Sequence, residues 1–106
     1  MKKFAVAGNE KKSIVEVIVC NENGLHIRPA SMIAQCAGKF KSKIDLEANG
    51  HTVDARGIFD ILLLAATKGT TVTITAEGDD HYEAVSALEI LFREGFPFEP
   101  VPEKLP

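Results

Sequence analysis

A histidine, an arginine and a proline lie within four residues of one another in the stretch Asn23 to Ser31. His26 follows a glycine turn, Arg28 lies two residues after it, and Pro29 comes next. The apolar residues that follow recur with the spacing of an amphipathic helix: Ala30, Ile33, Ala34 and Ala37. Because proline is tolerated in the first turn of a helix, this helix is predicted to begin at or next to His26. Gly38 is expected to end it.

This position gives His26 a specific chemistry. The positive end of a helix dipole disfavours the imidazolium, which leaves a neutral ring nitrogen able to act as a nucleophile. Helix N-termini bind phosphate through backbone N–H groups, here those of Ile27 and Arg28, and the Arg28 guanidinium matches phosphoryl oxygens. A cation near a helix start is unfavourable unless an anion binds there. The residues therefore predict a histidine that accepts and releases a phosphoryl group, although a lone histidine is more often structural.

The motif from Gly24 to Ser31 resembles the active-site motif of the HPr family, the histidine-containing phosphocarriers of the bacterial phosphoenolpyruvate-dependent phosphotransferase system. The resemblance in order and spacing runs from about Ser13 to Phe96. Its further matching features are Phe40, the Asn49-Gly50 turn, the Lys68-Gly69 turn, Glu77-Gly78 and the last helix. It implies that His26 is the phosphoacceptor and that Arg28 stabilises the phosphoryl group.

Composition limits the alternatives. A chain of 106 residues supports one small domain, and 45% hydrophobic with 25% charged residues is ordinary for a soluble protein. The net charge of -3 gives no reason to expect nucleic acid, and no apolar run approaches membrane-spanning length. Cys20 and Cys36 are expected to be free thiols in a reducing cytoplasm. No His/Cys spacing supports a metal, no cofactor is expected, and His51 and His81 are expected at the surface.

Three segments divide the chain. Residues 1–12 are predicted to form an N-terminal extension, residues 13–96 the HPr-like domain, and residues 97–106 an extended, proline-rich C-terminal tail. No function is assigned to either extension.

Alternating and helical patterns within the domain predict its fold. Strands are expected around Val15 to Val19, Ile44 to Glu47, up to Val53 across a hairpin at Asn49-Gly50, and Val72 to Ala76. Asp80 and Glu83 resemble a capping box that opens a last helix. Its predicted buried stripe is Ala84, Val85, Leu88, Leu91 and Phe92. The order of elements, βαββαβα, predicts an α+β open-faced β-sandwich with a four-stranded antiparallel sheet and three helices on one face. The HPr resemblance implies the same architecture.

A short segment from Gly57 to Ala66 is apolar almost all round its helical circumference. If Ile61, Leu64 and Ala65 face inward, the remaining apolar side chains lie near the surface and predict a docking patch. The patch would comprise Ile58, Phe59 and Leu62, with Leu63 beside them. A deeply buried helix or a strand is the alternative for so short a run. The HPr resemblance implies that this helix lies beside the histidine and is gripped by partners.

One position departs from the family pattern. Many HPr proteins carry a serine at the start of the short helix, where a kinase can phosphorylate it; here Gly57 has no hydroxyl. That regulation is expected to be absent, and the negative charge of Asp60 in the same helix is expected to tune partner choice.

The resulting functional hypothesis is a phosphocarrier for sugar transport. Enzyme I would pass a phosphoryl group from phosphoenolpyruvate to His26, and a histidine-bearing enzyme II domain would accept it. Such a transient carrier is expected to be a monomer without a substrate pocket, and to meet further regulatory proteins. The alternatives are a regulatory module that signals by the phosphorylation state of His26 without feeding sugar uptake, and an interaction protein with an incidental histidine.

Overall fold

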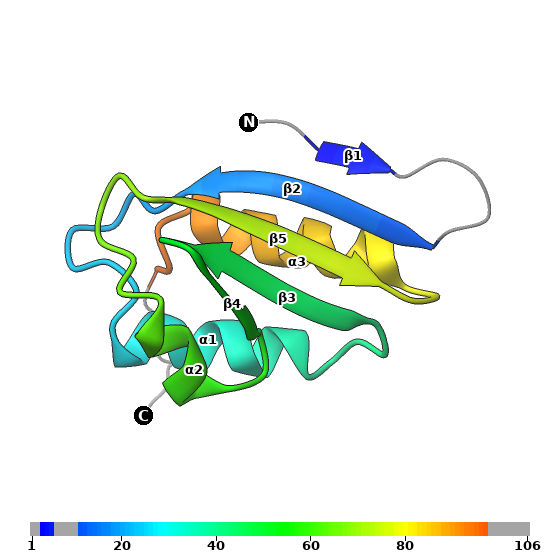
Figure 1. The fold of residues 1–106 in the computed structure, drawn as a ribbon, viewed down its shortest axis with the longest axis horizontal. Helices are drawn as coiled ribbons and strands as arrows, with labels where there is room; N and C mark the ends of the chain where they lie inside the picture. The colour runs from blue at the N-terminus through cyan, green and yellow to red at the C-terminus, as the bar shows by residue number, and fades with distance from the viewer. Residues whose placement is uncertain (1–2, 6–10, 98–106) are drawn as a thin grey trace, which may run out of the picture.

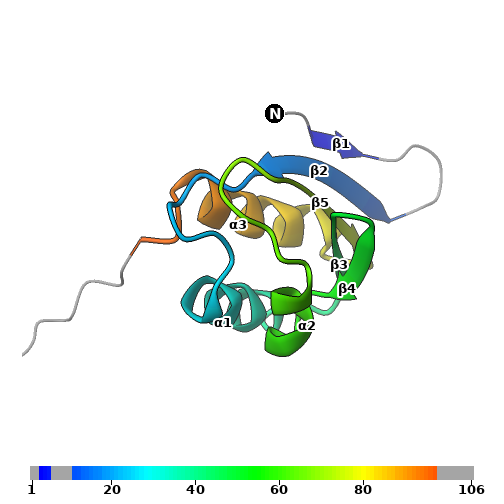
Figure 2. The same cartoon turned by 60° about the vertical axis from the view of Figure 1, so that its left-hand side comes forward.

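The structure is a computed structural model that describes residues 3–5 and 11–97. Within these residues, five strands form one antiparallel sheet in the order β1-β2-β5-β3-β4, and three helices lie on one of its faces (Figures 1 and 2). The elements are β1 Lys3–Ala5, β2 Lys12–Ile18, α1 Ile27–Ala37, β3 Lys43–Ala48, β4 His51–Asp54, α2 Ile58–Leu63, β5 Thr71–Glu77 and α3 His81–Arg93. The open-faced sandwich with four antiparallel strands and three helices is therefore confirmed, with one strand added.

The added strand is β1, which lies within residues 1–12, the predicted N-terminal extension. Lys3–Ala5 pairs with Ser13–Val15 along the outer edge of β2, and β2 itself begins at Lys12. An edge strand presents unpaired N–H and C=O groups, which even three residues of an added strand partly satisfy. Three residues are too few to show an alternating pattern, so this strand could not be predicted. Residues 1–2, 6–10 and 98–106, including most of the proline-rich tail, lie outside the described part of the chain.

The core lies between the sheet and the helices, and the predicted alternation of the strands is confirmed. Val15, Val17 and Val19 are buried, and Glu16 is exposed between them. Val15 stands opposite Ile74 in β5, and Ile74 also stands opposite Leu46 in β3. The other face of β5 carries threonines, exposed at Thr71 and half-buried at Thr73 and Thr75.

Helix α3 contributes the predicted stripe, with Leu91 half-buried and its other members buried. Its end is a left-handed turn in which the Phe96 amide donates to the Leu91 carbonyl at 3.0 Å and the Gly95 amide donates to the Phe92 carbonyl at 3.1 Å. These two bonds, with Gly95 at φ +73°, make a Schellman motif. The Phe96 side chain is buried against Phe92, with ring centroids 4.9 Å apart in an edge-to-face arrangement. Phe96 therefore anchors the chain after α3 to the core.

The predicted capping box at the start of α3 is wrong. Asp80 is the N-cap residue but makes no side-chain bond to its own helix. Its carboxylate instead accepts hydrogen bonds from the amides of Lys41 and Ser42, each at 2.9 Å, and from the Ser42 hydroxyl at 2.6 Å. These bonds lower the pKa of Asp80, with the Ser42 hydroxyl as the largest cause. Asp80 thus ties the chain after α1 to the start of α3.

The hairpin at Asn49-Gly50 is confirmed and has a second role. Both residues have positive φ, +53° and +82°, as the tightest hairpin turns require. The side-chain amide of Asn49 donates to the Leu64 carbonyl at 2.8 Å, just beyond the end of α2. Helix α2 is shorter than predicted, and the inward placement of Ala65 is wrong, because Ala65 lies beyond the helix at φ +51° and is exposed.

Candidate functional site

His26 is the N-cap residue of α1, as the sequence predicted. Its backbone is extended, at φ -84° and ψ -167°, and its carbonyl accepts the amide of Ala30 at 3.0 Å. The side chain is half-buried, and within the described residues its imidazole makes no hydrogen bond or ion pair. The first turn offers the amide groups of Ile27 and Arg28, and Pro29 has none to offer. A half-exposed imidazole therefore stands at the positive end of a helix.

A tight turn delivers His26 to this position. The His26 amide donates to the Gly24 carbonyl at 3.0 Å, and the Leu25 amide donates to the Ala66 carbonyl at 2.9 Å. Gly24 has φ +68°, and a Cβ at this residue would lie 2.5 Å from the Ala66 oxygen. Only glycine therefore fits between the turn and the segment that follows α2. The two chain segments are thus in direct backbone contact next to the histidine.

Arg28 lies one helical position beyond Ile27, and its guanidinium is engaged. Its Nη1 donates to the Phe96 carbonyl at 2.7 Å and lies 3.4 Å from the sulfur of Met32. The cost expected for a cation near a helix start is thus offset by a carbonyl oxygen from the end of α3. The left-handed backbone of Phe96, at φ +55°, aims that oxygen at Arg28.

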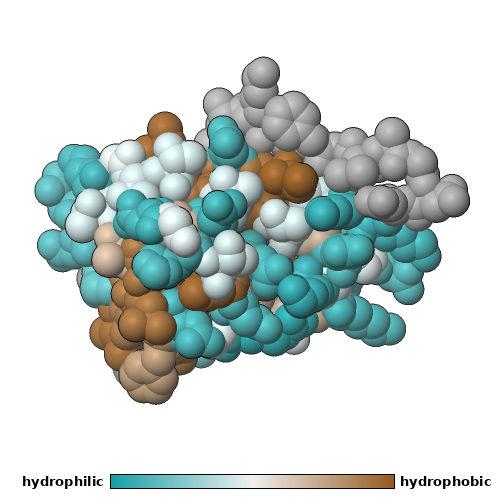
Figure 3. Space-filling model, in the orientation of Figure 1, coloured by the Kyte–Doolittle hydropathy of each residue, from teal (hydrophilic) through white to brown (hydrophobic). Residues whose placement is uncertain are grey.

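Exposed apolar side chains surround the start of α1 and cover α2. Phe59 is 76% exposed, Leu63 is 70% exposed and Ile27 is 58% exposed, whereas Ile58 and Leu62 are half-buried. Helices α1 and α2 are in contact, and Figure 3 shows the resulting hydrophobic area over α2, at the lower left. We call these five residues the apolar patch. Its members on α2 include all three residues predicted for docking, while Ile61 and Leu64 are buried as predicted.

The start of α2 is shaped by a glycine and a carboxylate. Gly57 is its N-cap residue and offers no side-chain bond to the helix. A Cβ at position 57 would lie 2.6 Å from Oδ2 of Asp60, so any larger residue would have to displace that carboxylate. The negative charge of Asp60 thus stands in the first turn of α2, where the helix dipole favours it.

A further link joins the loop before His26 to the loop between α2 and β5. The Lys68 ammonium donates to the Glu22 carboxylate at 2.7 Å, which lowers the pKa of Glu22 and raises that of Lys68. Because both side chains are more than half exposed, this pair adds little stability. The backbone bonds between the two loops carry the connection.

The other two histidines have different settings. His51 is exposed, as predicted. His81 is half-buried, and its Nδ1 lies 2.6 Å from the hydroxyl of the fully buried Ser13. His81 thus keeps part of its predicted surface position, but its ring also supplies the partner that the buried hydroxyl needs, which was not predicted.

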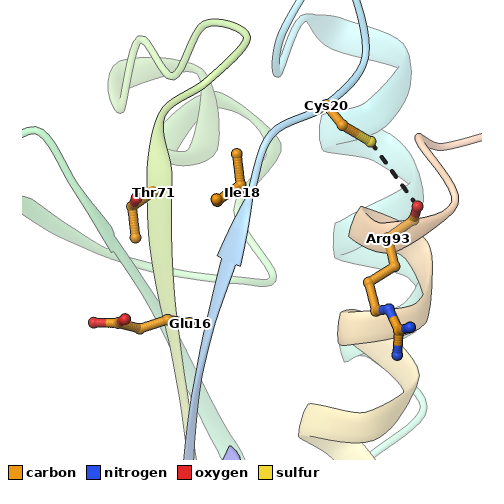
Figure 4. Close-up of a pocket in the computed structure, with 5 residues that line it drawn as sticks. All are labelled: Glu16, Ile18, Cys20, Thr71 and Arg93. Atoms are coloured by element: carbon orange, nitrogen blue, oxygen red, sulfur yellow. Dashed lines mark hydrogen bonds between the residues drawn. The ribbon is translucent and has the colours of Figure 1, made fainter. Parts of the chain in front are cut away.

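A surface hollow of about 390 Å³ lies away from His26. It is lined by Glu16, Ile18, Cys20, Thr71 and Arg93 (Figure 4). Figure 4 shows the thiol of Cys20 directed toward the Arg93 carbonyl, at 3.9 Å, and the same thiol lies 3.3 Å from the Phe92 carbonyl. Cys20 and Cys36 are free thiols, and burial raises the pKa of Cys36.

The described residues contain neither a candidate metal site nor a candidate membrane-spanning helix. They include no cluster of His, Cys, Asp or Glu side chains that could hold a metal ion. Across the same ranges, no helix has the length and apolar character needed to cross a bilayer.

Sequence reasoning missed three contributors to the site. Phe96, which supplies the carbonyl to Arg28, could have been found from the glycine before it, since an apolar residue after a C-terminal glycine is typical of a Schellman motif. Ala66, which binds Leu25, carries no signal of its own. The sequence predicts a role only for the amide of Ile27, whereas its exposed side chain also extends the apolar patch.

Comparison with known proteins gives consistent matches over the domain. A family model described as "PTS HPr component phosphorylation site" matches residues 14–94. The phosphocarrier protein HPr of Xylella fastidiosa is 38% identical over 81 residues, which cover 76% of this chain and 91% of that protein. A crystal structure of HPr from Thermoanaerobacter tengcongensis is 39% identical, with a TM-score of 0.76 over 82% of this chain and 98% of that one. An HPr dimer from the same organism is 39% identical, with a TM-score of 0.65 over 79% and 97%.

Proposed function

This chain belongs to the HPr family, the phosphocarriers of the phosphotransferase system, and from that premise we propose that it carries its phosphoryl group on His26. Phospho-enzyme I is the proposed donor, and a histidine of an enzyme II domain is the proposed acceptor. The observation that carries the proposal is an imidazole at the N-cap of α1 without a hydrogen-bond partner among the described residues, with Arg28 two positions later. The exchange would take place in the cytoplasm, in keeping with two free thiols.

The ring nitrogen that faces the amides of α1 is the proposed nucleophile. It forms a bond to phosphorus while the bond between phosphorus and the donor breaks. The charge that develops on the phosphoryl oxygens meets the N–H groups of the first turn, chiefly those of Ile27 and Arg28. A helix N-terminus stabilises such an anion by about 0.3–1 kcal/mol in an exposed setting and up to about 2 kcal/mol where it is partly buried. Such a contribution is small enough for the group to leave again, as a carrier requires.

Arg28 is the second element of the proposed mechanism. In the unphosphorylated protein its guanidinium holds the Phe96 carbonyl at 2.7 Å. Phosphoryl oxygens carry more charge than a carbonyl and accept stronger hydrogen bonds from arginine, typically about 1.5–3 kcal/mol each. Arg28 would therefore exchange the carbonyl for the phosphoryl group on phosphorylation. Between cycles the carbonyl would hold the guanidinium in one place.

The apolar patch is the proposed docking surface for enzyme I and the enzyme II domain. Phe59 and Leu63 are mostly exposed on α2, and α2 packs against α1, whose start bears His26. Large exposed apolar side chains beside a reactive group favour a transient protein interface. Partners that bind here would also cover the imidazole and exclude water from the transfer.

Two expectations about regulation and assembly complete the proposal. Gly57 has no hydroxyl to phosphorylate, so control by a serine kinase at this position would be absent. Further regulatory proteins would read the phosphorylation state of His26 through the same surface. The carrier would act as a monomer, because a dimer that covered the apolar patch would compete with partners.

The experiment is intact-mass analysis after incubation with phosphoenolpyruvate and an enzyme I, followed by addition of an enzyme IIA domain. We expect one phosphoryl adduct that is lost in acid and that passes to the enzyme IIA domain. The variant His26→Ala should stay unmodified and keep its fold. An acid-stable adduct, or an adduct that persists on His26→Ala, would refute the proposed carrier role of His26.

A further inference from the structure

Asn21 stands five residues before His26, at the start of the turn that leads to it. The Gly24 amide donates to the Asn21 carbonyl at 3.2 Å, which closes a four-residue turn. The side-chain amide of Asn21 crosses the same turn and donates from Nδ2 to the Gly24 carbonyl at 2.8 Å. Asn21 thus closes the turn twice, once as an acceptor through its backbone carbonyl and once as a donor through its side chain.

The Gly24 carbonyl that Asn21 holds is also the acceptor for the His26 amide, at 3.0 Å. Two donors therefore fix one oxygen, and the second donor belongs to the histidine itself. Loss of the first donor would remove one of three hydrogen bonds that hold the peptide between Gly24 and Leu25, whose oxygen also accepts the His26 amide and whose N–H donates to the Ala66 carbonyl. The peptide would then be held less tightly, because the glycine has no side chain to restrain it. The orientation of the His26 backbone depends on that peptide.

The Oδ1 atom of Asn21 indicates that the hydrogen bond from Nδ2 contributes more to the geometry of the site than to the stability of the fold. Oδ1 of Asn21 is buried and has no hydrogen-bond partner among the described residues. The opposite amide orientation would bring Oδ1 against the Gly24 carbonyl and leave Nδ2 buried without an acceptor, so it is less favourable. A buried acceptor without a donor costs about as much free energy as one neutral hydrogen bond supplies, or more. Asn21 therefore contributes little net stability, and its effect is concentrated on the Gly24 carbonyl.

We propose that Asn21 is a positioning residue for His26, which clamps the Gly24 carbonyl so that the imidazole is held at the mouth of α1 for phosphoryl transfer. This inference rests on the proposed function of His26. It goes beyond that function because it assigns a role to a side chain that touches neither the phosphoryl group nor a partner.

The first test is Asn21→Leu, which keeps the approximate shape and removes both the donor and the unpaired acceptor. We expect an unchanged or higher melting temperature, because apolar replacement of a half-satisfied polar group is neutral or stabilising. We also expect phosphorylation by enzyme I to slow about tenfold or more, since a misplaced reacting group loses rate steeply. The matched control is Gln35→Leu, the same kind of change at an exposed position of α1. It should leave the phosphorylation rate unaltered.

The second test uses Asn21→Asp, in which an oxygen replaces the donating nitrogen. This oxygen can bond to the Gly24 carbonyl only while the acid is protonated, and the adjacent carbonyl together with burial favours the protonated form. The phosphorylation rate of Asn21→Asp relative to the wild type should rise as the pH falls from 8 to 5.5. The same ratio for Asn21→Leu should not vary with pH. A general loss of loop structure would not produce this difference between the two variants.

Hydrogen exchange of the His26 amide separates this inference from the proposed function. Its exchange should be faster in Asn21→Leu than in the wild type, whether or not the protein accepts phosphate. Faster exchange in a protein that is never phosphorylated would uphold the clamp and refute the carrier role. An Asn21→Leu variant with wild-type exchange and wild-type phosphorylation would overturn the inference, as would an Asn21→Asp rate ratio that does not vary with pH.

Discussion

Two helices of this protein begin beside a histidine, at opposite ends of β2, and only one of these starts is suited to bind an anion. His26 is the N-cap of α1, and His81 is the first residue of α3 (Figure 1). The α1 start carries Arg28 and has no acidic residue in its first turn. The α3 start carries Asp79, Asp80 and Glu83, and the His81 ring is hydrogen-bonded to the buried hydroxyl of Ser13.

Under the proposed function of His26, a histidine at a helix start is not sufficient for phosphoryl chemistry. Carboxylates at the α3 start would repel a phosphoryl group, and the hydrogen bond to Ser13 occupies Nδ1 of His81. At the α1 start the imidazole is unpaired within the described chain, and the nearby cation is held by a neutral carbonyl. We call the α3 start the closed start, because its own side chains occupy it. We call the α1 start the open start, because its backbone N–H groups remain available to an incoming group.

The largest expected effect comes from replacing each histidine in turn. His26→Ala should abolish phosphorylation by enzyme I while the melting temperature changes little. His81→Ala should phosphorylate normally but lose about 1–3 kcal/mol of stability, because the Ser13 hydroxyl is left buried without its partner. Time-resolved intact mass and thermal unfolding of both variants check this. If His81→Ala were the variant that fails to accept phosphate, the two roles would have to be exchanged.

Arg28 should show the next largest effect. Arg28→Ala should slow phosphorylation by about 10²-fold, the loss typical of removing one preorganised donor to a developing charge. Arg28→Lys should recover part of the rate, since lysine keeps the charge without the planar donor geometry. The control is Arg93→Ala, an exposed arginine on α3, which should phosphorylate at the wild-type rate. Equal rates for Arg28→Ala and Arg93→Ala would remove Arg28 from the mechanism.

The apolar patch predicts a smaller effect that appears in partner binding. Phe59→Ala should raise the KM for enzyme I about tenfold, a typical cost for an interface anchor, with little change in melting temperature because the ring is 76% exposed. Ile90→Ala is the matched control, since Ile90 is 52% exposed on α3 outside the patch. Steady-state phosphorylation at varied concentrations of the carrier measures both. A large loss of stability in Phe59→Ala with unchanged KM would identify Phe59 as part of the core.

The smallest effect is expected at the closed start, from Asp80→Asn. Three donors lower the pKa of Asp80 in the folded protein, so its contribution to stability is present above the unfolded pKa near 4. The contribution is lost as the pH falls through the lower, folded value. Asp80→Asn should therefore melt a few degrees below the wild type at pH 7, and the difference should shrink below about pH 4. Glu83→Gln should have less effect, because Glu83 is not part of a capping box; a larger effect at Glu83 would restore that prediction.

The open start of α1 could be predicted from the sequence because its signals are local. Gly24, Pro29 and the apolar spacing after Pro29 fix the turn, the first helical turn and the buried face within a few residues. The strand alternation and the Asn49-Gly50 hairpin are local in the same sense, and these features are confirmed.

The contacts that complete each helix start could not be predicted, because they join distant residues. Arg28 meets the Phe96 carbonyl across 68 positions, and Ser13 meets His81 across the same separation. The sequence around Asp80 is typical of a local cap, but its carboxylate binds the amides of Lys41 and Ser42 and the buried Ser42 hydroxyl and not its own helix. A pattern in one segment does not reveal which distant groups will reach it, and nothing local to His81 predicts its bond to Ser13.

The most direct test of the account is to locate the phosphoryl group on the wild-type protein. The protein would be phosphorylated with phosphoenolpyruvate and enzyme I, digested at mildly alkaline pH to preserve phosphohistidine, and sequenced by electron-transfer mass spectrometry. We predict a single phosphoryl group on the peptide that contains His26, removed by brief acid treatment. A phosphoryl group on His81 or His51, or on a hydroxyl side chain, would contradict the assignment of the open start of α1 as the phosphoryl site.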